Sequence, residues 1–195
     1  MNTRLLLISH AATAAMRAAR CPADDPLDAR SIAEAQAARP HLAIPDKARV
    51  LTSPALCARE TAAALGLEAT VDEALTDLNY GEWRGRRLAD LASEAPQELA
   101  TWTRDPDASP PGGESFSQLV ERIGAWLDAL DANAPSEASA SGNVVAITHA
   151  PVLRAAIVGA LGASPAVFPR IEIAPLSAVE LRHTQRGWTW RPAAL

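Results

Sequence analysis

The chain has 195 residues, of which 48% are hydrophobic and 21% charged, an ordinary composition for a globular protein with one domain and its own core. Its formal net charge of −5 argues against a general nucleic-acid-binding protein, because such a protein needs a basic surface. The apolar run near the N-terminus has four large residues, too few for a signal sequence or a membrane span. We therefore expect a cytoplasmic protein without membrane contact.

Two segments near the ends of the chain are near-copies of each other. Residues 5–11 read Leu-Leu-Leu-Ile-Ser-His-Ala, and residues 144–150 read Val-Val-Ala-Ile-Thr-His-Ala. A short continuous apolar run is typical of a strand buried on both faces, as in a parallel α/β sheet. Each run leads to a histidine, His10 or His149, and open α/β sheets bind ligands beyond the carboxyl ends of their strands. We therefore expect both imidazoles at one edge of a sheet.

Signals for a helix, a strand and a second helix follow the first of these segments. Asp28 is expected to cap a helix that runs through Ala38, and residues 47–52 read as a strand. A Ser-Pro pair at 53–54 supplies an N-cap and a proline in the first turn, and Gly66 supplies the C-terminal stop. A second strand-to-helix junction therefore falls at residues 53–54.

The pattern then changes to shorter pieces within an insertion of roughly residues 77–111. Two short helices are expected at 87–93 and 96–103, and the segment is rich in aromatic residues. The insertion is expected to lie over one face of the sheet as a small cap. Trp83 is the aromatic residue that we expect near the mouth of a substrate site.

The remaining segments complete an α/β pattern. Apolar residues recur at helical spacing over 116–130, and residues 134–142 read as a Ser/Ala/Pro linker. After the second histidine segment a helix is expected over 151–161. Residues 177–183 and 188–190 then read as a closing antiparallel hairpin.

These elements predict a single domain over residues 1–195 of the α/β class. Its three α/β/α layers would surround a mostly parallel central sheet, with a small helical cap insertion at about 77–111. The two cysteines, Cys21 and Cys57, occur in no CxxC or Cys/His metal spacing, so neither a zinc site nor a disulfide framework is indicated. A single bridge between the two stays open.

Three ionisable groups fall at or near the strand-to-helix junctions: His10, Arg59 and His149. Helix N-termini offer free N–H groups and a positive dipole end, which favour an anion such as phosphate. One imidazole can attack phosphorus, while the arginine and the second imidazole neutralise the phosphoryl oxygens. An acid must then protonate the departing oxygen, and the insertion supplies Asp77 and Glu82 near its start.

The order of five motifs resembles the histidine phosphatase superfamily, which includes the cofactor-dependent phosphoglycerate mutases, the fructose 2,6-bisphosphate bisphosphatase domain and the α-ribazole phosphatases. The motifs are a strand ending in Arg-His-Gly-x-Thr, a Ser-Pro helix start with its arginine, a Gly-x-Trp-x-Gly segment, Pro-Gly-Gly-Glu-Ser, and a strand followed by His-x-x-x-x-Arg. Their counterparts here are residues 9–13, 53–62, 75–85, 111–115 and 149–154. Together the five motifs cover most of the chain in the family's order.

The resemblance implies a role for several residues. His10 would be the nucleophile that becomes phosphohistidine, and Arg59 and His149 would bind the phosphoryl group. Asp77 would be the proton donor in place of the family's usual glutamate, and Thr13 would be a hydroxyl that lines the pocket.

One residue departs from the pattern at a sensitive place. Ser9 stands where the family has an arginine, and it offers phosphate a single neutral donor. Arg17 or Arg20, in the segment after the nucleophile, could replace the missing guanidinium. Glu114 and Ser115 match a segment near the family's pocket, although they read equally well as the first acid and the N-cap of the following helix.

The predicted activity is that of a metal-independent phosphomonoesterase. It would act on a small phosphorylated metabolite through a phosphohistidine, without cofactor or metal, because Arg59 and His149 would supply the positive charge. The alternative is a weak or inactive family member that binds a phosphorylated ligand or partner, and Ser9 is its motivation. We expect a monomer or a homodimer.

Overall fold

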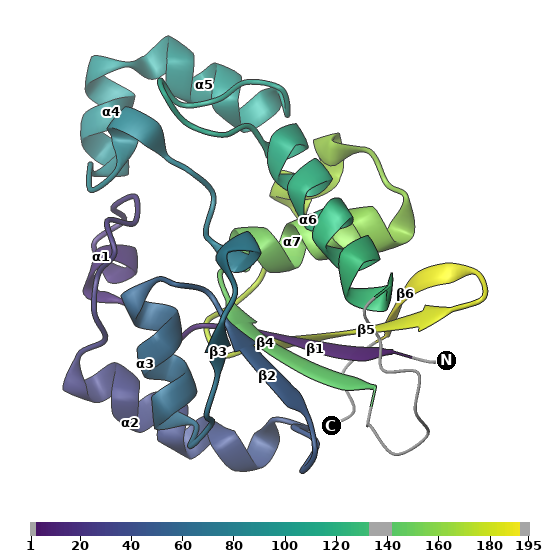
Figure 1. Ribbon diagram of the computed structural model, residues 1–195. Coiled ribbons are helices and arrows are strands. Elements are labelled where there is room, and N and C mark those ends of the chain that lie inside the picture. Colours follow the sequence, from purple (N-terminus) through teal and green to yellow (C-terminus); the bar gives the residue numbers. More distant parts are fainter. Residues whose placement is uncertain (1–2, 133–141, 192–195) are drawn as a thin grey trace.

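A six-stranded sheet with the order β3-β2-β4-β1-β5-β6 forms the centre of the computed structural model, which describes residues 3–132 and 142–191 (Figure 1). The strands are β1 (Arg4–Ser9), β2 (Arg49–Thr52), β3 (Thr70–Val71), β4 (Asn143–Thr148), β5 (Ala178–Thr184) and β6 (Gly187–Arg191). Strands β1 to β4 are parallel, whereas β5 runs antiparallel to β1 and pairs with β6 as an antiparallel hairpin. The predicted α/β class with a mostly parallel sheet is confirmed.

Helices cover both faces of this sheet (Figure 1). The α-helices are α1 (Ala14–Arg17), α2 (Ala29–Ala38), α3 (Leu56–Ala64), α4 (Leu88–Glu94), α5 (Pro96–Arg104), α6 (Phe116–Ala132) and α7 (Ala150–Leu161). Helices α6 and α7 lie on one face, and α3, with α2 packed against it, lies on the other. None of the helices in the described ranges is long and apolar enough to cross a membrane.

The apolar run of β1 is buried on both sides. Leu5 and Leu7 pack into the core formed with α6 and α7, whereas Leu6 and Ile8 pack on the opposite face against α3, where Ala58 is buried. Successive side chains of a strand point to opposite faces, so a run with no polar residue needs apolar cover on each. Strand β4 is parallel to β1 and carries the same pattern, which places the ends of both strands at one edge.

Most predicted elements agree with the structure within two residues. The Asp28 side chain accepts a hydrogen bond of 2.9 Å from the backbone N–H of Ser31 and so caps α2. Gly162, directly after α7, adopts the left-handed conformation at φ 58°. Strand β2 begins at Arg49, two residues later than predicted, and the two-residue strand β3 was missed because both its residues are exposed. Residues 134–141 of the predicted linker lie outside the described residues.

Helices α4 and α5 form the cap and stand away from the sheet (Figure 1). Its core contains Trp102, whose ring centroid lies 5.5 Å from that of Trp83 and 5.0 Å from that of Phe116. Trp83 is therefore buried inside the cap, not near a substrate as predicted. The backbone N–H of Cys21 donates to the carbonyl of Arg86 at 2.9 Å, which ties the loop after α1 to the cap.

Gly81 should be a sensitive point of the cap. It has φ 49°, and a Cβ atom there would lie 2.1 Å from the carbonyl oxygen of Pro111. We expect Gly81→Ala to lower the free energy of unfolding by at least about 2 kcal/mol, because a left-handed alanine and a backbone clash add together. Urea denaturation beside Gly159→Ala checks this, since a Cβ at that helical site meets open space and should stabilise by up to about 1 kcal/mol. Equal effects of the two substitutions would contradict the expectation.

Candidate active site

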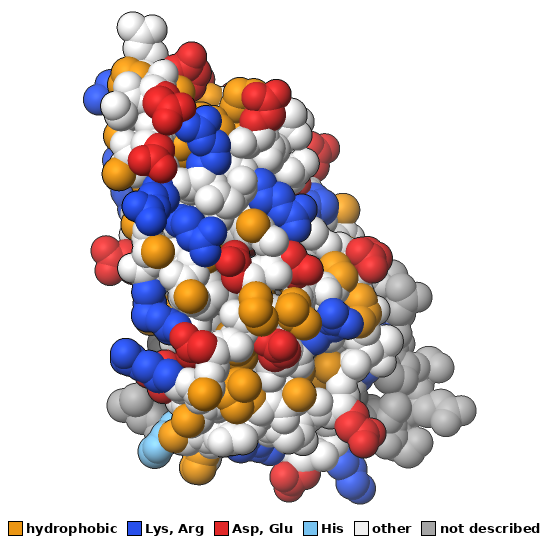
Figure 2. Space-filling view, turned by 90° about the vertical axis from the view of Figure 1, so that its left-hand side faces the viewer, with side chains coloured by type: hydrophobic (Ala, Val, Ile, Leu, Met, Phe, Trp, Pro, Cys, Tyr) orange, Lys and Arg blue, Asp and Glu red, His pale blue; other side chains and the backbone are white. Residues whose placement is uncertain are grey.

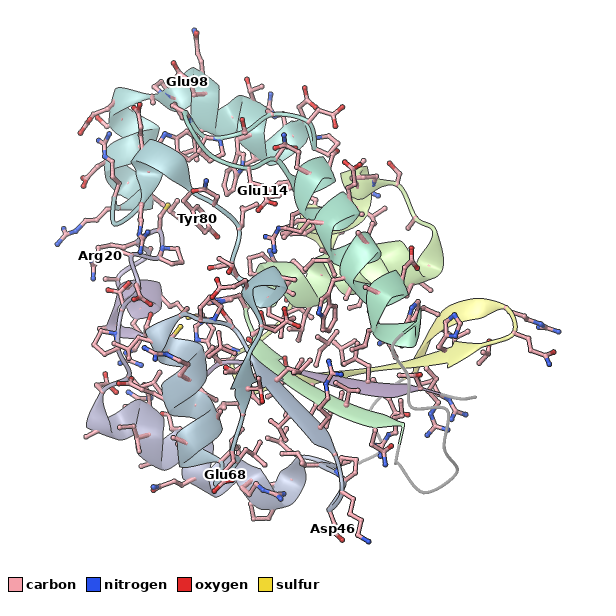
Figure 3. All side chains as sticks on the ribbon, in the orientation of Figure 1. Arg20, Asp46, Glu68, Tyr80, Glu98 and Glu114 are labelled. Atoms are coloured by element: carbon pink, nitrogen blue, oxygen red, sulfur yellow. The ribbon has the colours of Figure 1, made fainter. Side chains whose placement is uncertain are left out.

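A cavity of about 610 Å³ opens at the carboxyl edge of the parallel strands. The residues that follow β1 and β4, the start of α3, the loop after α1 and the segment 76–80 contribute to its walls. Figure 3 labels Arg20 in the loop after α1 and Tyr80 at the base of the cap, and both residues line the cavity. The face of the molecule turned to the viewer in Figure 2 carries Lys and Arg side chains interspersed with Asp and Glu. Among its described residues, this face therefore presents no patch of a single charge sign.

His10 follows the last residue of β1 and is buried. Its Nδ1 lies 2.7 Å from the carbonyl oxygen of Ala11. Because a carbonyl can only accept, Nδ1 carries the hydrogen and Nε2 of the neutral ring keeps a free lone pair. Burial, with a further contribution from His149, lowers the pKa of His10 to about 4, so the ring is neutral near pH 7. The contact with Ala11 thus leaves Nε2 as the ring atom with the chemistry of a nucleophile.

His149 is the N-cap residue of α7 and lies beside the first imidazole. The two ring centroids are 5.0 Å apart at an interplanar angle of 71°. Its Nε2 lies 2.8 Å from Ser53 Oγ, and its Nδ1 lies 3.4 Å from Asp77 Oδ2 without forming a hydrogen bond to any described residue. Burial lowers the pKa of His149 to about 3. The parallel pairing of β1 with β4 therefore brings together the two histidines that the sequence placed at strand ends.

Asp77 completes a group of three ionisable side chains in the cavity. Its Oδ1 accepts a hydrogen bond of 2.8 Å from the backbone N–H of Leu78. Burial raises the pKa of Asp77 to about 6, because the interior disfavours the carboxylate more than nearby positive groups favour it. A carboxyl group with such a pKa can hold a proton in mildly acidic solution and release it to a departing oxygen.

Glu114 holds the segment of Asp77 from outside the cavity. Its Oε1 accepts from Arg122 Nε at 2.9 Å, and the same guanidinium donates to the carbonyl of Ala74 at 2.7 Å and to that of Asp77 at 3.3 Å. Figure 3 labels Glu114 before the start of α6, and it is not among the residues that line the cavity. The structure therefore places Glu114 in contact with Arg122, outside the lining of the cavity, whereas the sequence predicted that it would contact phosphate.

Arg59 in helix α3 does not lie where the sequence predicted, beside the two histidines. That side chain is exposed and lies outside the lining of the cavity, whereas Cys57, two positions earlier, is buried and lines it. Two residues of an α-helix are separated by about 200° around the axis, so the two side chains face opposite ways. The prediction chose the wrong face of the helix, and the position opposite the two histidines belongs to a thiol.

The other predicted phosphate ligands are divided between the cavity and its surroundings. Thr13 lines the cavity and caps α1 by accepting from the N–H of Met16 at 3.2 Å. Arg20 also lines it and pairs with Asp25 at 3.3 Å. Ser9 is buried and Arg17 is exposed, and neither is among the lining residues. Arg17 instead pairs with the carboxylate of Asp28 at the start of α2.

The cavity is also lined by two arginines that were not predicted as site residues. Arg84 comes from the cap and Arg154 from α7, five residues after the second histidine. The Arg154 guanidinium carbon lies 5.7 Å from the centroid of the Phe168 ring, and its Nε is buried without a hydrogen-bond partner among the described residues. The His-x-x-x-x-Arg spacing contains the signal for Arg154, since it places both residues in the first two turns of one helix.

The arrangement can perform acyl-type or phosphoryl-type transfer. It joins a neutral imidazole with a free Nε2 to a carboxyl group that holds a proton near pH 6, while arginines lie around the same cavity. The N-terminus of α7, a helix of 12 residues, opens on the cavity through Ala150 and Pro151 and favours negative charge there.

Comparisons with known proteins agree with this architecture. The sequence profile of the histidine phosphatase superfamily (branch 1) matches residues 5–193. A bifunctional protein of Mycobacterium tuberculosis is 30% identical over 139 residues, which are 68% of this chain and 37% of that protein. A 2,3-bisphosphoglycerate-dependent phosphoglycerate mutase of Gloeobacter violaceus is 29% identical over 117 residues, 60% of this chain and 52% of the mutase. The matched part of the chain thus spans only 37% and 52% of the length of these two relatives.

Solved structures share the fold over almost the whole chain. A mycobacterial glucosyl-3-phosphoglycerate phosphatase superimposes with a TM-score of 0.85 at 24% identity, covering 98% of this chain and 97% of that one. The α-ribazole phosphatase of Shigella flexneri superimposes with a TM-score of 0.82 at 24% identity, covering 96% and 94%. Likeness at this level of identity shows that the three chains have one fold.

Proposed function

Because the chain belongs to the histidine phosphatase superfamily, we propose that it is a phosphomonoesterase that acts on a small phosphorylated metabolite through a phosphohistidine at His10. Two structural neighbours carry the names of phosphatases for such metabolites, which supports this class of substrate. The observation that carries the proposal is the hydrogen bond from His10 Nδ1 to the Ala11 carbonyl, because it leaves Nε2 as the nucleophilic atom. The protein would act as a monomer or a homodimer.

The proposed reaction has two steps. In the first, His10 Nε2 forms a bond to phosphorus while the bond from phosphorus to the leaving oxygen breaks, and Asp77 gives its proton to that oxygen. In the second, Asp77 takes a proton from water as the water oxygen attacks phosphorus, and the N–P bond breaks to release phosphate. The histidine returns to its neutral form, and the carboxyl group regains its proton.

In this proposal the positive charge for phosphate comes from Arg20, which the sequence offered as a substitute for the missing arginine, and from two arginines that it did not single out. Arg59 lies outside the cavity, so Arg20, Arg84 and Arg154 are the arginines available there among the described residues. The N-terminus of α7 adds a partial positive charge close to His149.

The alternative function is binding of a phosphorylated ligand without turnover. Two positions beside the nucleophile favour it, because Ser9 directly precedes His10 and Cys57 faces the cavity where a guanidinium would bind phosphate most directly. A lost charge-assisted contact of this kind costs about 2–4 kcal/mol of transition-state stabilisation. Phosphate release from an aryl phosphate, measured in the presence of a chelator, separates the two functions, since only the enzyme releases phosphate.

Substitution of the thiol should show whether a missing guanidinium limits the rate. We expect Cys57→Arg to raise kcat/KM for an aryl phosphate by about 10- to 100-fold, since the new side chain starts opposite both histidines. The matched control is Arg59→Gln, which should change kcat/KM by less than about twofold because Arg59 lies outside the cavity. A large loss of activity in Arg59→Gln would instead restore Arg59 as a substrate ligand.

A further inference from the structure

A second chemical feature of the cavity is the cluster formed by His10, Cys57 and His149. All three side chains are buried, and one donor atom from each lies within 4.8 Å of the donor atoms of the other two. A tetrahedral Zn²⁺ ion with Zn–N of about 2.0–2.1 Å and Zn–S of about 2.3 Å holds its donors about 3.3–3.6 Å apart. Movements of about 1 Å of these side chains would therefore bring the three donor atoms to the spacing that the ion requires. We propose that these three residues form a binding site for a thiophilic divalent cation of the Zn²⁺ type.

Both imidazoles are already oriented as metal ligands are. Metal-bound histidines usually make a hydrogen bond with the ring nitrogen that does not bind the ion. His10 does so through Nδ1 and the Ala11 carbonyl at 2.7 Å, and His149 does so through Nε2 and Ser53 Oγ at 2.8 Å. The nitrogens that remain are His10 Nε2 and His149 Nδ1, and the latter is buried without a hydrogen-bond partner among the described residues.

Asp77 offers a fourth ligand and completes the charge balance. Its Oδ2 lies 3.4 Å from His149 Nδ1. Nitrogen and oxygen ligands of one tetrahedral Zn²⁺ ion lie about 3.3 Å apart, so this distance is close to the one required. A divalent cation with one thiolate and one carboxylate has no net charge, which removes most of the penalty of burial. Binding deprotonates the Cys57 thiol and releases that proton to solvent.

The donor set decides which ions fit. Imidazole nitrogen and thiolate sulfur bind Zn²⁺, Co²⁺ and copper well, whereas Mg²⁺ and Ca²⁺ require oxygen ligands.

The three residues come from the end of β1, the start of α3 and the end of β4, so the site exists only in the folded protein. The ligand spacing along the chain therefore resembles no zinc motif.

This site goes beyond the proposed function and competes with it. An ion on His10 Nε2 occupies the lone pair that would attack phosphorus, and an ion on Asp77 removes the proton donor. We expect the metal-bound protein to be inactive as a phosphatase and the metal-free protein to be the form that reacts. The site would therefore make the activity sensitive to thiophilic metals.

Binding of Co²⁺ and Zn²⁺ to the full chain tests the site without any substrate. The protein is first freed of metal with a chelator, and Co²⁺ is then added while absorption is recorded. We expect a thiolate-to-cobalt charge-transfer band in the near ultraviolet and the strong visible bands of a tetrahedral ion, with one ion per chain. Zn²⁺ should displace the Co²⁺, and competition with a chromophoric chelator then gives the Zn²⁺ affinity.

Two cysteine variants make the test specific. Cys57→Ser should lose the charge-transfer band and at least about 100-fold in Zn²⁺ affinity, whereas Cys21→Ser, the matched control from the cap core, should keep both. His10→Gln should keep the thiol but bind Zn²⁺ at least about 100-fold more weakly, which covers the case of a misfolded serine variant. No charge-transfer band, or unchanged affinity in Cys57→Ser and His10→Gln, would overturn the proposal.

The metal site and the phosphatase activity can fail independently. A protein that shows the charge-transfer band but never releases phosphate contradicts the proposed function alone. A protein that releases phosphate through His10 but binds neither Co²⁺ nor Zn²⁺ contradicts the metal site alone.

Discussion

Replacing His10 by alanine should reduce kcat/KM for aryl phosphates by about 10⁴-fold or more. The imidazole forms the covalent bond in the proposed first step, and the hydrogen bond from its Nδ1 to the Ala11 carbonyl leaves Nε2 free to attack phosphorus. Phosphate release is measured in the presence of a chelator. The variant is used only if it unfolds at the same temperature as the parent protein, so that a loss of activity does not reflect a loss of folding.

The control for this substitution is His41→Ala. His41 lies exposed in the short helix Arg39–His41 and lines no part of the cavity, so its loss should leave turnover unchanged. If His10→Ala retained more than about one tenth of the activity, the imidazole would not be the nucleophile. A loss of activity in both variants would point to a general effect on folding.

Asp77→Asn should reduce kcat/KM by about 10²- to 10³-fold for substrates whose leaving group needs a proton. An alkyl phosphate is such a substrate, whereas a nitrophenyl phosphate departs as a stable anion and should lose far less. Measuring both esters with one variant therefore separates the loss of a proton donor from damage to the site. Equal losses on the two esters would contradict the role of Asp77 as the acid.

The pH dependence of the parent protein follows from the same two groups. His10 must be unprotonated to attack, so kcat/KM should rise as the pH increases through its pKa of about 4. Asp77 must be protonated to act as the acid, so kcat/KM should fall as the pH increases through its pKa of about 6. The optimum should lie between the two values for alkyl phosphates, and the upper limb should disappear in Asp77→Asn. A rate that keeps rising above pH 7 would contradict this assignment.

The strands and most helices could be predicted because their signals are local. Residues Leu5 to Ile8 are all apolar, so a strand there needs apolar cover on both faces of the sheet. The side chain of Asp28 caps the helix that it precedes. Strand β3 has no such signal, because Thr70 and Val71 are exposed and gain their strand conformation only by pairing with β2.

The site was predictable where the backbone alone brings residues together. Parallel strands end at one edge, and for that reason His10 and His149 meet there. Arg59 failed because a motif read along the chain does not show which face of α3 turns toward the cavity. The burial of Asp77 and Cys57 likewise depends on packing between distant segments, so neither the raised pKa of Asp77 nor the thiol beside the imidazoles could be read from spacing.

The central claim is a phosphohistidine on His10, and trapping that intermediate tests it most directly. The metal-free protein is mixed with an aryl phosphate near pH 5, quenched in base, where phosphohistidine survives, and digested for mass spectrometry. We predict a phosphoryl group on His10 that forms and decays at least as fast as phosphate is released, and that is absent from His10→Ala. Release of phosphate without any phosphoryl group on His10, or with the group on another residue, would contradict the account.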